Sequence, residues 1–520
     1  MNRLSAFEMG RGFTLRKFFT LLLSMLLVCS TFSAAFMQTS GSAVLMMGFE
    51  MEDNNRQWQD NLFFTRMEER TGIRFDFLQY GDFDAYQAKL DSLNPGDAQL
   101  PGVLFKARLS PATAGELYQK QVLIDLSPYL EQYAPNLSAL MRQDPAIRQA
   151  ITLPGGVIPA LPYIAQTPGQ NILWINHSWL EALNLSMPRT AAELEQVLLA
   201  FLEKDPNRNG RNDEIPLSFI GPYDLKYLAH AWGLAANDFN IYLRDGQARF
   251  MPKEDAFEEF TIWCARLFAQ GLLDRNGFTT VDTLRRQTDA KADNRYGAFF
   301  GPLPTSLVPV EWAGQYQAMM PLTYQGTATY RAVAGRVSYG AFALTTACKD
   351  VPAMLAWVDT LYTQEGAILA GIGLEGEDYV VDGDGSWRLL REAGDRSYFA
   401  RSVIATDQFA PGISSDDFQI LYTDPMVKTL TEQTRAVAAQ SVIPFPELPL
   451  SAEQAAVLAP MQARLGRYVD ESFARFVLGE WPADSEHFQL FRDGLQERGV
   501  EEFIAFWQEV FEGSTQDAGT

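Results

Sequence analysis

The sequence predicts an α/β fold, in which strands and helices alternate along the chain. Residues 43–49 form an apolar run of strand length, and residues 57–70 are predicted to form a helix. Residues 73–78 then alternate between apolar and polar side chains, as expected for a strand with one buried face. A strand, a helix and a second strand in this order are typical of an α/β sheet.

Further helices are predicted later in the chain. Thr190 and Glu193 form a capping-box pattern, and an apolar stripe follows at Leu194, Val197, Leu198, Phe201 and Leu202. Asp350 and Pro352 open another helix, which we expect to run to residue 362. The last hundred residues are predicted to be mainly helical, with core candidates Phe473, Phe476, Val477, Leu495, Phe503 and Phe506.

Composition and charge limit the possible functions. The chain has 520 residues, enough for two or three domains, and 47% of them are apolar, as in ordered globular proteins. The formal net charge of −22 argues against nucleic acid as a partner, because phosphates need a basic face. Cys264 and Cys348 lie in apolar surroundings, so we expect buried free thiols rather than a disulfide framework.

The N-terminus predicts export from the cytoplasm. A basic stretch with Arg11, Arg16 and Lys17 precedes an apolar segment at residues 18–28, which is short for a membrane span. Small residues before position 36 favour a signal peptide over residues 1–35, cleaved after Ala35. Cys29 leaves open a lipoprotein in which this cysteine is the membrane anchor. Residues 513–520 are expected to be a disordered tail.

A polar loop after the predicted helix at residue 190 has the pattern of a calcium site. Oxygen-bearing side chains recur at alternate positions, and Gly210 stands where an EF-hand loop needs a turn. The expected ligands are Asp205, Asn207, Asn209, the Arg211 carbonyl, Asp213 and Glu214. Pro216 occupies the position of the usual bidentate Glu, and we expect Glu214 to replace it. The alternative is a polar surface turn, which uses the same residue types.

The same loop, with a DPNxNGxxDEIP pattern at residues 205–216, resembles the large extracellular solute-binding proteins of ABC-type carbohydrate importers. The alginate-binding members look most similar, and this kind of loop holds a structural calcium ion in them. Further segments that resemble the family stand in the expected order at residues 100–105, 123–130, 160–163, 173–176, 362–366 and 371–376.

This resemblance implies a two-lobed fold of the periplasmic-binding-protein type, in which the lobes exchange chain segments. The first lobe would comprise residues 36–165 and 326–372, and the second residues 166–325 and 373–512. The chain would cross between lobes near residues 163–170, 324–335 and 371–376. A ligand crevice would then lie between the lobes, at the ends of the strands.

Catalytic motifs are weak in this sequence. Residues 371–376 spell GxGxxG, but they follow a predicted helix, whereas a dinucleotide site needs a strand before the glycines. His177, His230 and His487 are scattered, and none stands in an obvious triad context. Residues 382–385 spell DGDG, which suits a hairpin turn better than a second metal loop.

Aromatic side chains are the better indication of a ligand, because the apolar faces of sugar rings stack on them. The candidates are Tyr163, Trp232, Phe300, Trp312 and Tyr339, which the fold would bring near the crevice. The alternative for each of them is core packing. Trp174 and Trp357 are predicted to be core residues, because they stand inside a strand and a helix.

The sequence therefore favours a monomeric, extracytoplasmic receptor that binds an oligosaccharide and delivers it to the permease subunits of an ABC importer. In this interpretation the protein is not an enzyme, Ca²⁺ is its structural cofactor, and nucleic acid is not a partner. Two alternatives remain. One is a secreted carbohydrate-active enzyme with a structural calcium site. The other is a surface protein whose calcium loop mediates assembly as in dockerins, although dockerins have two such loops.

Overall fold

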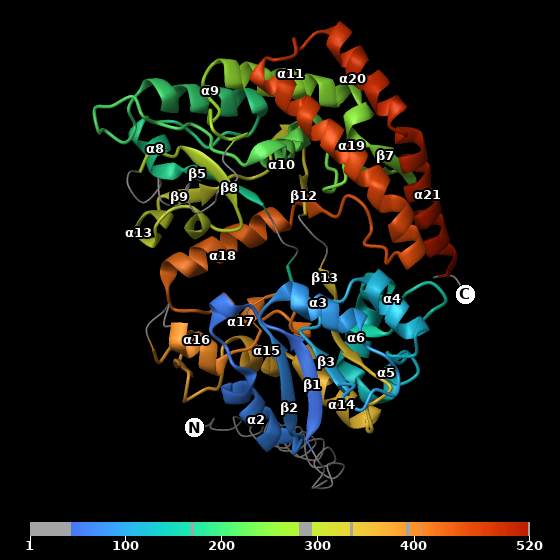
Figure 1. The fold of residues 1–520 in the computed structure, drawn as a ribbon. Coiled ribbons are helices and arrows are strands. Elements are labelled where there is room, and N and C mark those ends of the chain that lie inside the picture. Colours follow the sequence, from blue (N-terminus) through green and yellow to red (C-terminus); the bar gives the residue numbers. More distant parts are fainter. Residues whose placement is uncertain are drawn as a thin grey trace, which may run out of the picture.

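The protein has two lobes, which lie one above the other in Figure 1. The computed structural model describes residues 43–167, 171–279, 294–332, 336–391, 396–405 and 407–517. The expected signal peptide, Cys29 and the last three residues of the expected tail lie outside these residues. Within the described residues, no helix is both long enough and apolar enough to cross a membrane.

The first lobe is built on a six-stranded mixed sheet with the strand order β16-β4-β13-β3-β1-β2. Its strands are β1 (Val44–Phe49), β2 (Phe75–Tyr80), β3 (Val103–Phe105), β4 (Ala160–Ile164), β13 (Val337–Leu344) and β16 (Gly412–Ile413). β1 pairs in parallel with both β2 and β3, whereas β13 is antiparallel to β3 and β4. The carboxyl ends of β1, β2 and β3 therefore meet at one edge of the sheet.

Local sequence signals explain the helices around this sheet. The predicted helix at residues 57–70 is divided into a 3₁₀ turn and α2 (Leu62–Thr71), because the Asn61 side chain caps α2 by accepting from the Phe63 amide. Asp350 caps α14 (Val351–Asp359) in the same way. The predicted core tryptophan Trp357 is fully buried between this helix and the sheet.

The second lobe contains a small antiparallel sheet covered by helices. Its order is β8-β5-β9, formed by β8 (Ala298–Gly301), β5 (Ile172–Asn176) and β9 (Tyr316–Ala318). Helix α9 (Ala191–Glu203) begins at Thr190 as predicted, although Glu193 accepts from the Arg189 amide rather than completing the capping box. The predicted helical C-terminal region consists of α19 (Ala452–Leu478), α20 (Ser485–Glu497) and α21 (Val500–Asp517), on the outer side of this lobe (Figure 1).

The third crossing between the lobes lies later than the sequence predicts. Residues 373–424, expected in the second lobe, pack on the first, since β16 pairs with β4. Arg66 of α2 forms a buried ion pair of 2.7 Å with Asp378, which fixes the start of this segment to the first lobe. The chain then enters α18 (Pro425–Ala438), whose Gln433 side chain accepts from the Ala318 amide of the second lobe.

The segment has a small aromatic core of its own. Trp387 stacks on Phe418 with ring centroids 5.0 Å apart, and Tyr379 and Tyr422 pack around them. The turn at residues 382–385 joins β14 (Tyr379–Val381) to β15 (Trp387–Leu389) as a hairpin, which confirms the predicted turn. This core supports the loop and the short helix α17 (Asp416–Gln419) that follow it.

Candidate functional site

Two oppositely charged side chains lie buried at the carboxyl ends of neighbouring parallel strands. Glu50 follows β1 and Lys106 follows β3, and both side chains are fully inaccessible to solvent. Lys106 Nζ lies 2.8 Å from Glu50 Oε2, and Arg56 Nη1 lies 2.6 Å from Glu50 Oε1. The Glu50 carboxylate also accepts from the side chains of Asn54 and Trp58. Such complete pairing is what allows a charge to remain buried.

Asp407, from the loop before β16, joins this network from the outside. Its Oδ2 lies 3.1 Å from Lys106 Nζ and 3.6 Å from Arg108 Nη2. The Arg108 guanidinium also stacks over Phe409, 3.8 Å from the ring centre, and over Phe49, at 4.7 Å. Both Lys106 and Arg108 have φ values of +48°, a conformation that non-glycine residues rarely adopt and that is concentrated at functional sites.

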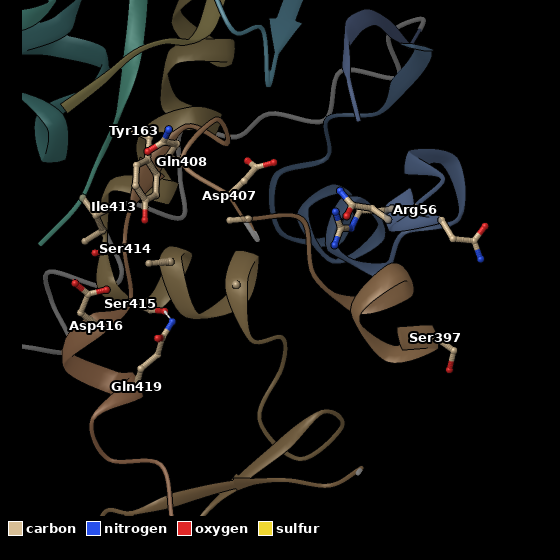
Figure 2. Close-up of a pocket in the computed structure, with 15 residues that line it drawn as sticks. Arg56, Tyr163, Ser397, Asp407, Gln408, Ile413, Ser414, Ser415, Asp416 and Gln419 are labelled. Carbon is tan, nitrogen blue, oxygen red and sulfur yellow. Dashed lines mark hydrogen bonds between the residues drawn. The ribbon is translucent and has the colours of Figure 1, made fainter. Parts of the chain in front are cut away.

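A cavity of about 1190 Å³ lies beside this network, on the first lobe (Figure 2). Its lining is mainly polar and includes Arg56, Tyr163, Asp407, Gln408, Ser414, Ser415, Asp416 and Gln419. Figure 2 shows Tyr163, Gln408, Asp416 and Gln419 together on one side and Arg56 on the other. Figure 1 places α17, which carries two of these residues, on the side of the first lobe that faces α18.

Tyr163 lines the cavity at the end of β4, next to the first crossing between the lobes. Burial, helped by the nearby Asp416 charge, raises the pKa of its hydroxyl to about 12. The hydroxyl is therefore a hydrogen-bond donor and acceptor at neutral pH, and its ring is a surface on which a ligand can pack.

The other predicted ligand residues do not gather around this cavity. Trp232 packs on helix α11 (Asp255–Ala269), with its ring 5.1 Å from Trp263 and 5.4 Å from Phe260. Phe300 is 5% exposed in β8. Trp312 packs half-buried against the core of the second lobe.

Tyr339 of β13 lines a second cavity, which is also lined by Pro444 and Trp507 of the second lobe. Of the five aromatic candidates, Tyr163 alone lines the large cavity.

The charged residues of the site were missed by the sequence interpretation, although a signal for two of them exists. Glu50 and Lys106 each follow directly after an apolar run of strand length. In an open α/β sheet, the carboxyl ends of parallel strands are where ligands bind. Asp407 and Asp416 carry no comparable signal, because only the pairing of β16 with β4 brings them to this edge.

The three histidines have structural partners. His230 is buried, its Nδ1 lies 2.6 Å from the Tyr227 carbonyl oxygen, and its Nε2 accepts from the Leu322 amide. Burial lowers the pKa of His230 to about 4, so its ring is neutral at pH 7. His487 lies against Asp484, which caps α20, and His177 is 3.6 Å from Glu181.

The predicted calcium loop is closed by its own hydrogen bonds. Asp205 accepts from the amides of Asn209 and Gly210, and Gly210 has the positive φ (+73°) that its place in the loop requires. Asp213 accepts from the Asn209 side chain. In the described residues, no three His, Cys, Asp or Glu side chains gather closely enough to hold a metal ion.

Glu214 is the residue of this loop whose environment fits a cation best. It is 7% exposed, and its Oε1 is buried without a hydrogen-bond partner in the structure. Burial raises the pKa of its carboxyl, and the charges of Asp205 and Asp213 raise it further. A cation beside Glu214 would compensate the carboxylate charge that burial and the nearby Asp205 and Asp213 disfavour.

Solved structures of solute-binding proteins have the same fold, and one of them is a substrate-binding protein of an ABC transporter. No protein-family model matches the chain. FusA of Streptococcus pneumoniae, solved in complex with kestose, has a TM-score of 0.71 and 21% identity, covering 92% of this chain and 100% of that chain. An extracellular solute-binding protein from Bifidobacterium longum subsp. infantis has a TM-score of 0.76 and 19% identity over 92% of this chain and 100% of that chain. These matches confirm the predicted two-lobed fold.

A sequence match and two further solved structures add to this comparison. The chain is 32% identical over 231 residues to the fructooligosaccharide ABC transporter substrate-binding protein FusA of S. pneumoniae serotype 4, a match that spans 42% of each chain. A FusA EF-hand mutant has been solved with fructo-nystose, at a TM-score of 0.70 and 20% identity over 92% of this chain and 100% of that chain. The alginate-binding protein AlgQ2, solved without calcium ion, has a TM-score of 0.66 and 20% identity, covering 92% of this chain and 99% of that chain.

Proposed function

We propose that the protein is an extracytoplasmic receptor that binds an oligosaccharide and delivers it to an ABC importer. The observation that carries this proposal is the polar cavity of about 1190 Å³ on the first lobe. Pockets for small molecules have volumes of roughly 300–1,000 Å³ and mainly apolar linings. A larger cavity with amide, hydroxyl and carboxylate groups suits a ligand of several sugar rings, whose hydroxyls need such partners.

Similar proteins support a receptor rather than an enzyme. The neighbours with this fold are binding proteins, and FusA has been solved in complex with kestose and with fructo-nystose. We propose that the second lobe closes over the ligand about the three crossings and that permease subunits recognise the closed form of the monomer. The protein turns over no substrate in this proposal.

Calorimetric titration of the full-length protein with kestose, nystose and longer fructans tests the proposal. We expect saturable binding to at least one member of this panel and an unchanged sugar after prolonged incubation. Products that accumulate with time would assign the protein to the carbohydrate-active enzymes instead. Absence of binding across neutral and acidic oligosaccharides would contradict a carbohydrate receptor.

Replacement of Tyr163 is expected to weaken ligand binding with little loss of stability. A tyrosine side chain that packs on a sugar ring contributes on the order of 1–2 kcal/mol through area alone, so Tyr163→Ala should raise Kd by about tenfold. Tyr163→Phe keeps the ring and serves as the matched control for the hydroxyl. Equal affinities of the wild type and Tyr163→Ala, measured by calorimetry, would place the ligand elsewhere.

We further propose that the loop at residues 205–214 holds one structural Ca²⁺ through the six predicted ligands. The buried Oε1 of Glu214, which lacks a hydrogen-bond partner, supports this assignment. Calcium at a hundredfold excess over its Kd should raise the free energy of unfolding by about 2.7 kcal/mol. Denaturant unfolding with calcium and with EDTA measures this difference. Glu214→Gln should reduce this stabilisation by calcium. Identical unfolding curves of the wild type with calcium and with EDTA would contradict the calcium site.

A further inference from the structure

Two cations near the large cavity, Arg56 and Lys106, are already paired with the protein's own carboxylates. The Arg56 guanidinium, which lines the cavity, contacts Glu50 at 2.6 Å. Lys106, behind it, lies 2.8 Å from Glu50 and 3.1 Å from Asp407. An anionic ligand would have to compete with these short ion pairs, which are the partners that keep the buried charges stable.

Asp416, on the opposite side of the cavity, has a different environment. The adjacent Asp417 pairs with Arg435 at 2.8 Å, whereas no basic side chain of the described residues pairs with the Asp416 carboxylate. Asp416 is half-buried in the first turn of α17, close enough to Tyr163 for its charge to affect that hydroxyl. Its two oxygens are therefore available acceptors in the cavity.

We propose that this cavity selects neutral oligosaccharides over uronate-containing ones and that Asp416 is the residue that discriminates between them. This inference rests on the proposed receptor function. Sugar hydroxyls can donate to the Asp416 carboxylate, and bonds to a charged acceptor are the stronger kind. A uronate carboxylate in the same position would meet a like charge, and among the described residues no basic side chain pairs with Asp416 to offset it. The net charge of −22 disfavours its approach in addition.

Titration calorimetry with two trisaccharides of opposite kind tests the selectivity. Kestose is the neutral probe and trigalacturonate the acidic one, each measured on the full-length protein at low and high salt. We expect trigalacturonate to bind at least about a hundredfold more weakly, since juxtaposed like charges cost several kcal/mol. Acidic trisaccharide binding that equals or exceeds the neutral one would overturn the selectivity but leave the receptor function intact. If neither trisaccharide binds, and longer neutral and acidic oligomers do not bind either, both proposals are overturned.

Two isosteric variants separate the role of Asp416 from that of overall charge. Asp416→Asn should weaken kestose binding by about tenfold, because a charged acceptor is lost. The same change should also reduce the ratio of the trigalacturonate Kd to the kestose Kd by at least about tenfold. Asp417→Asn removes the same charge from the next residue, which does not line the cavity, and should alter neither affinity. If both variants changed the affinities equally, Asp416 would act only through the net charge of the protein, and its specific role would be contradicted.

Discussion

Lys106→Met is expected to lower the free energy of unfolding by about 3 kcal/mol, because it removes one of the two cations that pair with the buried Glu50 carboxylate. Lys106 contacts both Glu50 and Asp407, and its side chain is fully buried. Methionine has a similar length and fits the same space, so the loss reports charge rather than a cavity. Urea unfolding monitored by circular dichroism measures the change.

A double-mutant cycle separates pairing from simple truncation. The double variant with Glu50→Gln should lose less stability than the sum of the two single variants, because both members of the Lys106–Glu50 pair are then absent. Lys349→Met, at an exposed position before α14, is the matched control and should change stability by less than about 0.5 kcal/mol. Additive effects of the Lys106 and Glu50 changes would show that the two side chains are not energetically coupled.

Trp232→Ala is expected to destabilise the second lobe rather than to weaken ligand binding. The Trp232 ring packs on Phe260 and Trp263 of α11. Loss of these aromatic contacts should lower the free energy of unfolding by about 3 kcal/mol, as other large-to-small substitutions in a core do. Thermal unfolding and calorimetric titration of the same sample measure stability and affinity together.

Trp232→Phe is the matched control, since it keeps a ring against α11 and should recover much of the stability. The sequence alone made Trp232 one of five candidates for a sugar-stacking surface, with core packing as the alternative. A stable Trp232→Ala variant with reduced affinity would support the sugar-stacking role and place part of the ligand on the second lobe.

The fold was predictable because its signals are local. The apolar run before Glu50, the Thr190 cap and the Asp350 cap each define an element from residues that are neighbours in the chain. Such periodicity and capping arise from backbone geometry and do not depend on distant contacts. The third crossing was misplaced for the complementary reason. It depends on the Arg66–Asp378 ion pair, whose members are far apart in the sequence.

The site was predicted less well, because it combines segments that only the tertiary structure brings together. Tyr163 was found through its aromatic character, but Asp407 and Asp416 reach the same cavity through the β16–β4 pairing. Aromatic type alone did not distinguish Tyr163 from Phe300, which packs into the interior of its lobe. Glu50 and Lys106 could have been found by asking which charged residues directly follow apolar strands.

The assignment of residues 373–424 to the first lobe has a kinetic consequence. The residues that line the large cavity all belong to the first lobe. An oligosaccharide can therefore dock on one preformed surface before the second lobe reaches it. The association rate would then be governed by the first lobe, and the residence time of the bound sugar by how firmly the second lobe closes. Natural variation in the second lobe could thus tune how long a sugar is held without changing which sugar is captured.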